Sequence, residues 1–209
     1  KLAQSKLKKA TFYDGINEFL KLREMLMQEM LSWKKLLSSD DYCAIPFINA
    51  DGYHSKTVAY SIWHIIRIED IVVNSLIRRK KEVLYENNFD KKIGADIITT
   101  GNELVKQEIA EFSKKLNIEA LYEYALSVKA STDEWLKSIH YEDIKKKFGD
   151  DDKKRISELG VVSDDESAVW LIDYWCNKDI SGLIKMPLSR HWIMHIEAAN
   201  RIKEKLLDK

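Results

Sequence analysis

Apolar side chains recur every three or four residues along four long stretches of the chain, which is the spacing of an amphipathic helix. These stretches cover about residues 12–37, 57–80, 117–139 and 187–207. In the first, the apolar positions are Phe19, Leu22, Leu26, Met30, Trp33 and Leu37. The last begins at Pro187, a residue that suits the first turn of a helix. The pattern therefore predicts four long helices.

Shorter elements are expected between them. Thr100 and Glu103 have the spacing of a capping box, which predicts a helix that begins at Gly101 or Asn102 and reaches residue 116. Ser163 and Glu166 repeat that spacing before another apolar stretch. Residues 42–56 and the highly charged 145–155 read as loops, the second with a short turn.

Scarce helix breakers agree with this pattern, since 209 residues include 7 Gly and 2 Pro. The length suits one domain or two small ones, and no internal repeat or low-complexity linker divides the chain. We therefore predict an all-α fold: a single helical-bundle domain over 1–209, with 1–11 loosely ordered. Its architecture would be a four-helix bundle with additional short helices.

Charge and cysteine content exclude several classes of protein. The 34 basic and 34 acidic side chains cancel, which argues against a general nucleic-acid binder. No apolar run reaches the roughly 20 residues of a membrane-spanning helix. Cys43 and Cys176 are too few for a disulfide scaffold or a thiolate-only zinc site. No apolar signal segment precedes the first helix, so a cytoplasmic location is expected.

The most informative polar residues are histidines. His191 and His195 lie four residues apart, on the apolar face of the last predicted helix. Buried imidazoles need polar partners, and a metal ion is one partner that both rings can share. His64 lies in the middle of the second predicted helix. Three imidazoles with no fourth protein ligand would leave a position open for water or substrate.

Other interpretations compete with this one. Such histidines are often hydrogen-bonded core residues, and a bis-histidine haem site has no motif behind it. A zincin needs Glu after the first His of the pair, where Trp192 stands. A di-iron bundle needs an acid three residues before a ligating His, and none is present. His54 and His140 are expected to be exposed.

Glu69 occupies an apolar row of the second predicted helix, where an unpaired carboxylate would be costly. It is a candidate to orient a metal-bound imidazole or to relay a proton. The alternative is a buried ion pair with Lys or Arg from another helix. Arg67 and Asp70 point to other faces and are expected to be solvated.

Two segments together resemble the DinB-like (DinB/YfiT-like) family. The segment 57–70, TVAYSIWHIIRIED, is similar to the second helix of that family, and 187–197, PLSRHWIMHIE, is similar to its last helix. Each segment alone is a weak signal. The arrangement of one His on the second helix and His-x-x-x-His on the last is specific, and the resemblance extends from about residue 12 onward.

The resemblance implies a four-helix bundle of unusual helix order in which His64, His191 and His195 hold a divalent metal ion, zinc or nickel above all. It further implies an enzyme acting on a small-molecule substrate. Family members with assigned activities are often S-transferases or isomerases that use a low-molecular-weight thiol: bacillithiol, mycothiol or glutathione. Homodimers are common, and exposed aromatic residues would supply the interface, with Tyr13, Trp33 and Trp135 as candidates.

The resemblance also marks residues 163–177 as an added helix that would cover the site. The alternative is that Trp170 and Trp175 merely fill core or dimer contacts. Cys43 and Cys176 are poor candidates for a nucleophile. Three functions remain open: a metal-dependent transferase or hydrolase, a non-catalytic metal-binding stress-response protein, and a structural dimerisation module with buried histidines.

Overall fold

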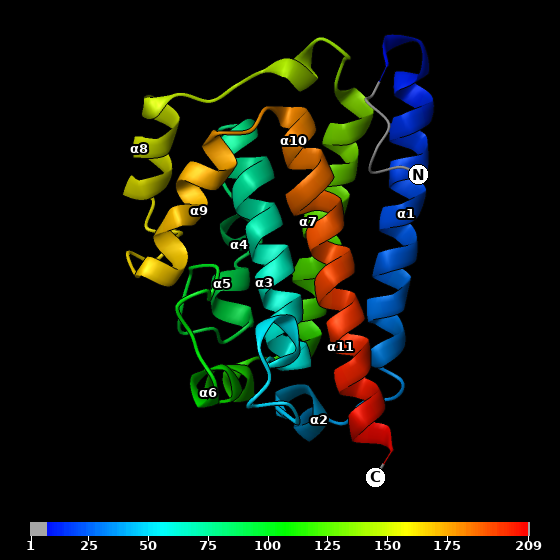
Figure 1. Ribbon diagram of the computed structural model, residues 1–209, viewed down its shortest axis with the longest axis vertical. Helices are drawn as coiled ribbons and strands as arrows, with labels where there is room; N and C mark the ends of the chain where they lie inside the picture. The colour runs from blue at the N-terminus through cyan, green and yellow to red at the C-terminus, as the bar shows by residue number, and fades with distance from the viewer. Residues whose placement is uncertain (1–7, 209) are drawn as a thin grey trace.

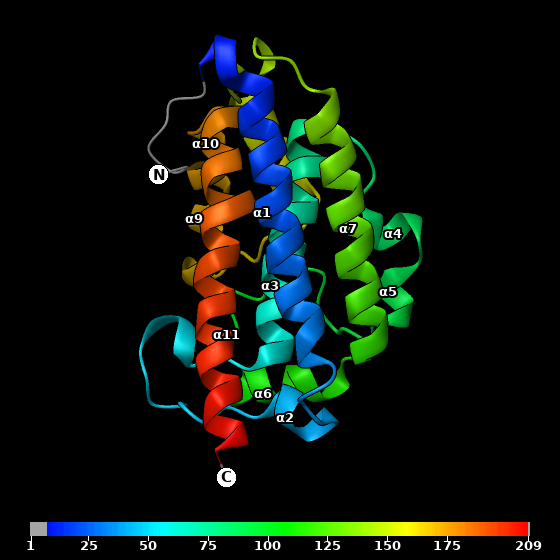
Figure 2. The same ribbon diagram turned by 90° about the vertical axis from the view of Figure 1, so that its right-hand side faces the viewer.

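A computed structural model describes residues 8–208 as an all-α fold (Figures 1 and 2). Four long helices form the bundle: α1 (Phe12–Trp33), α3 (Val58–Asp70), α7 (Ile118–Ser138) and α11 (His191–Leu207). Both α1 and α3 pack against α7 and against α11, which closes the four into one bundle. The described range contains no β-strand, only an isolated bridge between Lys147 and Asp179.

In the view of Figure 1, α1 runs down, α3 and α7 run up, and α11 runs down. Because α3 and α7 run in the same direction, the chain must return along the bundle between them. It does so through three short helices, α4 (Val83–Glu86), α5 (Phe89–Lys92) and α6 (Gln107–Lys115). The middle of α3 lies against the start of α11, far away in the sequence.

Short elements occupy parts of the chain that were predicted to be loops. The predicted loop at 42–56 contains the end of α2 (Ser39–Cys43) and the 3-10 turn η2 (Gly52–His54). Another 3-10 turn, η1 (Lys9–Thr11), precedes α1. The prediction of loose order over 1–11 falls largely on 1–7, which lie outside the described residues.

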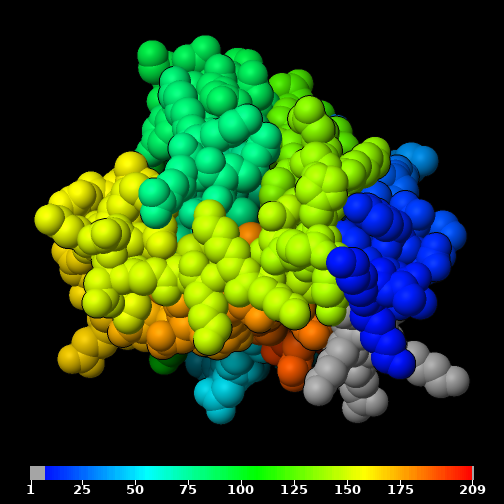
Figure 3. Space-filling view, turned by 90° about the horizontal axis from the view of Figure 1, so that it is seen from above, coloured from blue at the N-terminus to red at the C-terminus, as the bar shows by residue number. Residues whose placement is uncertain are grey.

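The loop predicted at 145–155 is wrong, because α8 (Asp150–Glu158) forms there after the short turn η4 (Asp143–Lys145). Three aspartates in the first turn of α8 complement the helix dipole. Asp152 also accepts a bond of 3.1 Å from the Gly149 backbone, and Ile156 is buried. Figure 3 looks onto the end of the bundle at which α7 ends and shows the segment after α7 crossing that end.

The helix predicted to run from Gly101 or Asn102 to residue 116 forms as α6, but it begins at Gln107, and residues 101–106 are a turn before it. Gly101 and Lys106 both have positive φ, which an α-helix excludes. Thr99, not Thr100, donates to the Glu103 carboxylate. The second predicted helix start is nearly right, since α9 (Glu166–Cys176) is capped by Asp165 in place of Ser163.

Two of the long helical stretches contain a π-helical segment. The helix α3 continues into η3 (Ile71–Ile77), and α10 (Ile180–Lys185) continues through η5 (Met186–Arg190) into α11. Regular apolar spacing does not separate these segments from α-helix. The second π segment ends directly before His191 and therefore sets the angle at which α11 presents its first turn.

All thirteen residues of α3 are buried, which corrects the expectation that Arg67 and Asp70 are solvated. Asp70 accepts bonds from the Val83 and Leu84 backbone and from the Tyr124 hydroxyl. Arg67 donates to the Ile98 carbonyl at 2.7 Å and pairs with Glu82 at 2.7 Å. These polar residues hold the crossover against the central helix.

Trp33 and Trp135 are also buried, so the prediction that they supply a dimer interface is wrong. Tyr13 is exposed, as expected. No helix among the described residues is long and apolar enough to cross a membrane.

Candidate metal centre

Three histidines from two helices meet inside the bundle. His64 comes from the middle of α3, and His191 and His195 come from the first two turns of α11. One ligand atom from each ring lies within 4.8 Å of the others. All three side chains are buried, with 5%, 8% and 3% of their surface exposed. The structure thus brings together the three residues predicted as metal ligands.

The tautomer of His64 follows from its hydrogen bond. Its Nδ1 lies 2.8 Å from the carbonyl oxygen of Thr100, which only accepts, so Nδ1 carries the proton. The other nitrogen, Nε2, then carries no proton, and its lone pair is available to a metal ion. A backbone carbonyl in this position is the usual means of orienting a metal-ligating imidazole.

His191 and His195 contain the unsatisfied atoms of the site. Nδ1 of His191 and both ring nitrogens of His195 are buried without a hydrogen-bond partner. Leaving such atoms unpaired costs about 1–3 kcal/mol each, and a metal ion would satisfy one on each ring. The residues present therefore fit a divalent ion.

The three rings are electrically neutral at pH 7. Burial lowers the pKa of His64 to about 4, partly opposed by its bond to Thr100. Burial, together with the neighbouring imidazoles, holds the pKa of His191 and His195 well below the ordinary value. Neutral imidazole is the form that binds metals, so these rings need no deprotonation step at neutral pH.

Aromatic rings hold the cluster in place. Tyr60, one turn before His64, stacks on that ring at a centroid distance of 5.5 Å, and its hydroxyl donates to Gly101. Tyr53 of η2 makes a T-shaped contact with the His195 ring, at a centroid distance of 4.7 Å. Thr57 caps the start of helix α3, and its side chain accepts a bond from the Tyr60 backbone.

A cavity of about 210 Å³ opens onto the three imidazoles. Besides the histidines its lining is mostly aromatic and aliphatic: Tyr53, Ile68, Asn102, Trp170, Leu171, Tyr174, Trp175, Met186 and Pro187. The site therefore combines three convergent imidazole ligands with adjacent space, which a purely structural histidine cluster would not need.

Helix α9 covers the site, as predicted for residues 163–177. Trp170 and Trp175 both line the cavity, although they differ in burial: Trp170 is 48% exposed and Trp175 is 1% exposed. Ser167, near the start of α9, donates to the Asn102 carbonyl at 3.2 Å. The turn at 100–102 thus holds both His64 and this covering helix.

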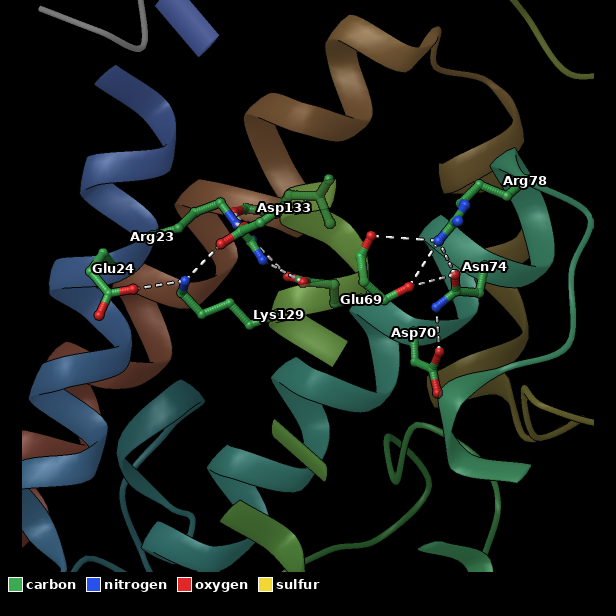
Figure 4. Close-up of polar contacts among 10 residues, drawn as sticks. Arg23, Glu24, Glu69, Asp70, Asn74, Arg78, Lys129 and Asp133 are labelled. Carbon is green, nitrogen blue, oxygen red and sulfur yellow. Dashed lines mark hydrogen bonds and ion pairs between the residues drawn. The ribbon is translucent and has the colours of Figure 1, made fainter. Parts of the chain in front are cut away.

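Glu69 forms a buried ion pair, the alternative considered for it from the sequence. Both of its carboxylate oxygens accept bonds from the buried Arg23 of α1, at 2.6 and 2.9 Å. Glu69 does not line the cavity, so this geometry does not support an orienting or proton-relay role. Arg23 also pairs with Asp133 of α7 and donates to the Leu188 carbonyl in η5. Figure 4 shows Arg23, Glu24, Glu69, Lys129 and Asp133 of this network.

The remaining histidines and the cysteines lie apart from the cluster. His140 is exposed as predicted, whereas His54 is half-buried against Phe47, which corrects that expectation. Burial raises the pKa of Cys176 to about 11 and raises that of Cys43. Neither thiol lines the histidine cavity, in agreement with their exclusion as nucleophiles.

Several site residues were not predicted from the sequence. The Thr100 carbonyl is a backbone group, which leaves no sequence signal. Asn102 was assigned to the start of a helix that begins only at Gln107, and Tyr174 and Met186 carry no motif. Tyr53 lies in the 3-10 turn η2, within a segment predicted to be a loop, and nothing there indicates which helix it contacts.

Comparisons with known proteins identify the fold only. No family model matches the chain, and no curated protein matches it. A crystal structure of a conserved protein from Enterococcus faecalis is similar, with a TM-score of 0.59 and 16% sequence identity. The match covers 97% of this chain and 99% of that one. At this identity the likeness supports the all-α fold and assigns no function.

Proposed function

We propose that this chain is a divalent-metal-dependent enzyme of the DinB-like type, in which His64, His191 and His195 hold the ion. The observation that carries the proposal is the convergence of three buried imidazoles beside a cavity. Zinc and nickel both suit an all-imidazole site. The bundle architecture agrees with what the family resemblance implies.

The reaction we favour is thiol-dependent S-transfer to a small electrophile. A divalent ion with three neutral ligands strongly lowers the pKa of a bound thiol or water. The chain itself contributes orientation and the exclusion of water. Thr100 and Tyr60 fix His64, while the rings of α9 cover the cavity. Hydrolysis with water as the nucleophile is the second candidate, because the same site would serve it.

A non-catalytic metal-binding stress-response protein is the alternative of another class. An ion-storage site needs ligands but no adjacent room for a substrate. The cavity beside the imidazoles therefore favours the enzyme. Homodimer formation, a cytoplasmic location and the lack of a nucleic-acid partner stay predictions from the sequence.

The proposal is tested by turnover with the metal-loaded protein. Zinc- or nickel-loaded chain is incubated with glutathione or bacillithiol and a panel of activated aryl chlorides and epoxides, and loss of thiol is followed. Ester hydrolysis is assayed in parallel. We expect metal-dependent turnover that His195→Ala abolishes and that His140→Ala, at an exposed histidine, leaves unchanged.

The contrary result is equally definite. If the protein binds about one ion per chain but catalyses neither reaction above the level of free metal, the enzyme proposal is wrong. The storage or sensing alternative would then take its place.

A further inference from the structure

The cavity beside the histidines has a composition that restricts its ligand. Four aromatic rings, from Tyr53, Trp170, Tyr174 and Trp175, line it together with aliphatic side chains. None of its lining residues is Asp, Glu, Lys or Arg. Placing a charged group in such surroundings without a partner is costly. The walls therefore select against a ligand whose body is charged.

Lysines do occur near these aromatic rings. The Lys178 ammonium lies 3.6 Å from the ring centroid of Tyr174, and that of Lys56 lies 5.1 Å from the centroid of Tyr60. Neither lysine lines the cavity. Their ammonium groups are held on aromatic faces outside the lining, and besides burial the charge of Lys56 helps to lower the pKa of His64 and His195.

The size of the cavity sets a second restriction. A cavity of roughly 150 Å³ holds benzene, whereas pockets for drug-sized ligands start near 300 Å³. At about 210 Å³, this one has room for a single substituted ring or an aliphatic group of similar size.

The charge of the ligand set gives a third restriction. Three neutral imidazoles would leave a divalent ion its full charge, and no carboxylate lines the cavity to offset it. One anionic donor atom from the ligand reduces that charge in buried surroundings. A substrate with one ionisable donor atom meets this need.

We propose that the cavity receives the uncharged, apolar body of a substrate about the size of one aromatic ring, which directs a single ionisable donor atom toward the three imidazoles. This inference rests on the proposed metal function and narrows it to a class of substrate. Any charged portion of a thiol cofactor would remain outside this cavity.

The test uses the Co²⁺-loaded protein, whose visible spectrum reports on ligands of the ion. Benzenethiol and 4-mercaptobenzoate are compared as probes, because they share the ring and the donor and differ by one carboxylate. Both probes are compared through the change in this spectrum, and we expect benzenethiol to bind at least about tenfold more tightly than 4-mercaptobenzoate. A tenfold difference in affinity corresponds to roughly 1.4 kcal/mol of binding free energy. Calorimetric titration supplies an independent measure of both affinities.

A matched pair of variants tests the role of the wall. Trp170→Ala removes a half-exposed ring that lines the cavity, and Val169→Ala alters its 44% exposed neighbour outside the lining. We expect Trp170→Ala to lower the affinity for benzenethiol about three- to tenfold. Azide, an anionic donor with no apolar body, should keep its affinity in both variants, and benzenethiol should keep its affinity in Val169→Ala.

The outcomes separate the inference from the function beneath it. If Co²⁺ binds to the three histidines but the two thiols bind equally well, the inference is overturned and the metal site stands. The inference is also overturned, and the metal site stands, if Trp170→Ala lowers the affinity for azide as much as that for benzenethiol. If Co²⁺ does not bind, the proposed metal function fails and the inference fails with it.

Discussion

The imidazoles of the site differ from that of His140 in what surrounds their ring nitrogens. His64 has one nitrogen fixed by a backbone carbonyl, and His195 has two buried nitrogens with no partner. His140, in contrast, is exposed and lies near the Tyr13 hydroxyl. The spacing of His191 and His195 was sufficient to predict a shared face. His64 needed the family resemblance as well, because a lone His in a buried helix has many explanations.

Acid should destabilise the metal-free protein through these residues. The pKa of His64 falls from an ordinary 6.5 to about 4 on folding, so the unfolded chain binds more protons between those values. The stability contributed by the neutral ring is therefore fully present above pH 6.5 and lost as the pH falls toward 4. At about 1.4 kcal/mol per pKa unit, His64 alone would contribute about 3 kcal/mol.

Urea unfolding of metal-free protein between pH 4 and pH 7.5 measures this dependence. His64→Gln should make the curve shallower by the contribution of that ring, because His191 and His195 remain, and His140→Gln at the exposed histidine is the matched control. A stability that does not vary across this range would show that the buried rings are not held neutral.

At the scale of the elements, the apolar pattern predicted the long helices but not the short charged helix or the π-helical junctions. Long apolar rows identified the four bundle helices, because burial of one face enforces the spacing. The pattern missed α8, whose many charges resemble a loop, although Ile156 anchors it. It also missed both π segments, since a shift of one residue in hydrogen bonding hardly alters the apolar spacing. The histidine pair was predictable, but the angle set by η5 was not.

The network around Arg23 joins α1, α3, α7 and η5, so its loss should act on stability more than on metal binding. Glu69→Leu leaves part of the buried guanidinium charge unpaired. We expect the free energy of unfolding to fall by about 3 kcal/mol, the lower end for breaking a buried ion pair. Asp133 still pairs with Arg23 and limits the loss.

Chemical unfolding and metal content, measured together, distinguish the two roles considered for Glu69. Glu24→Leu, which removes an exposed carboxylate paired with Lys129, should cost less than about 1 kcal/mol. If a folded Glu69→Leu protein loses its metal, the ion-pair interpretation is incomplete and an orienting role is supported.

The two tryptophans of α9 should respond differently to truncation. Trp175 is fully buried, and Trp175→Ala should lower the free energy of unfolding by about 3–5 kcal/mol. Trp170 is half-exposed, and Trp170→Ala should cost less than about 1 kcal/mol. Thermal or urea unfolding of both variants measures the difference. Equal losses would mean that Trp170 packs as a core residue and does not serve the cavity.

At the scale of the whole molecule, the crossover between α3 and α7 completes the site. The packing of α3 against α11 brings the three imidazoles together, and the crossover delivers the Thr100 carbonyl and Asn102 to the same place. The sequence reveals little of this path, because its turns are set by positive-φ residues and buried polar contacts without a periodic pattern. The four helices were predictable, but their mutual arrangement entered only through the family resemblance.

The central claim is that His64, His191 and His195 together hold one divalent ion. Elemental analysis of the purified protein, before and after incubation with zinc, nickel or manganese, tests it most directly. We predict about one ion per chain in the wild type and in His140→Ala, and its loss in His64→Ala, His191→Ala and His195→Ala. A folded wild-type protein that takes up no metal, or histidine variants that retain it, would contradict the claim and leave the three imidazoles as residues of the core.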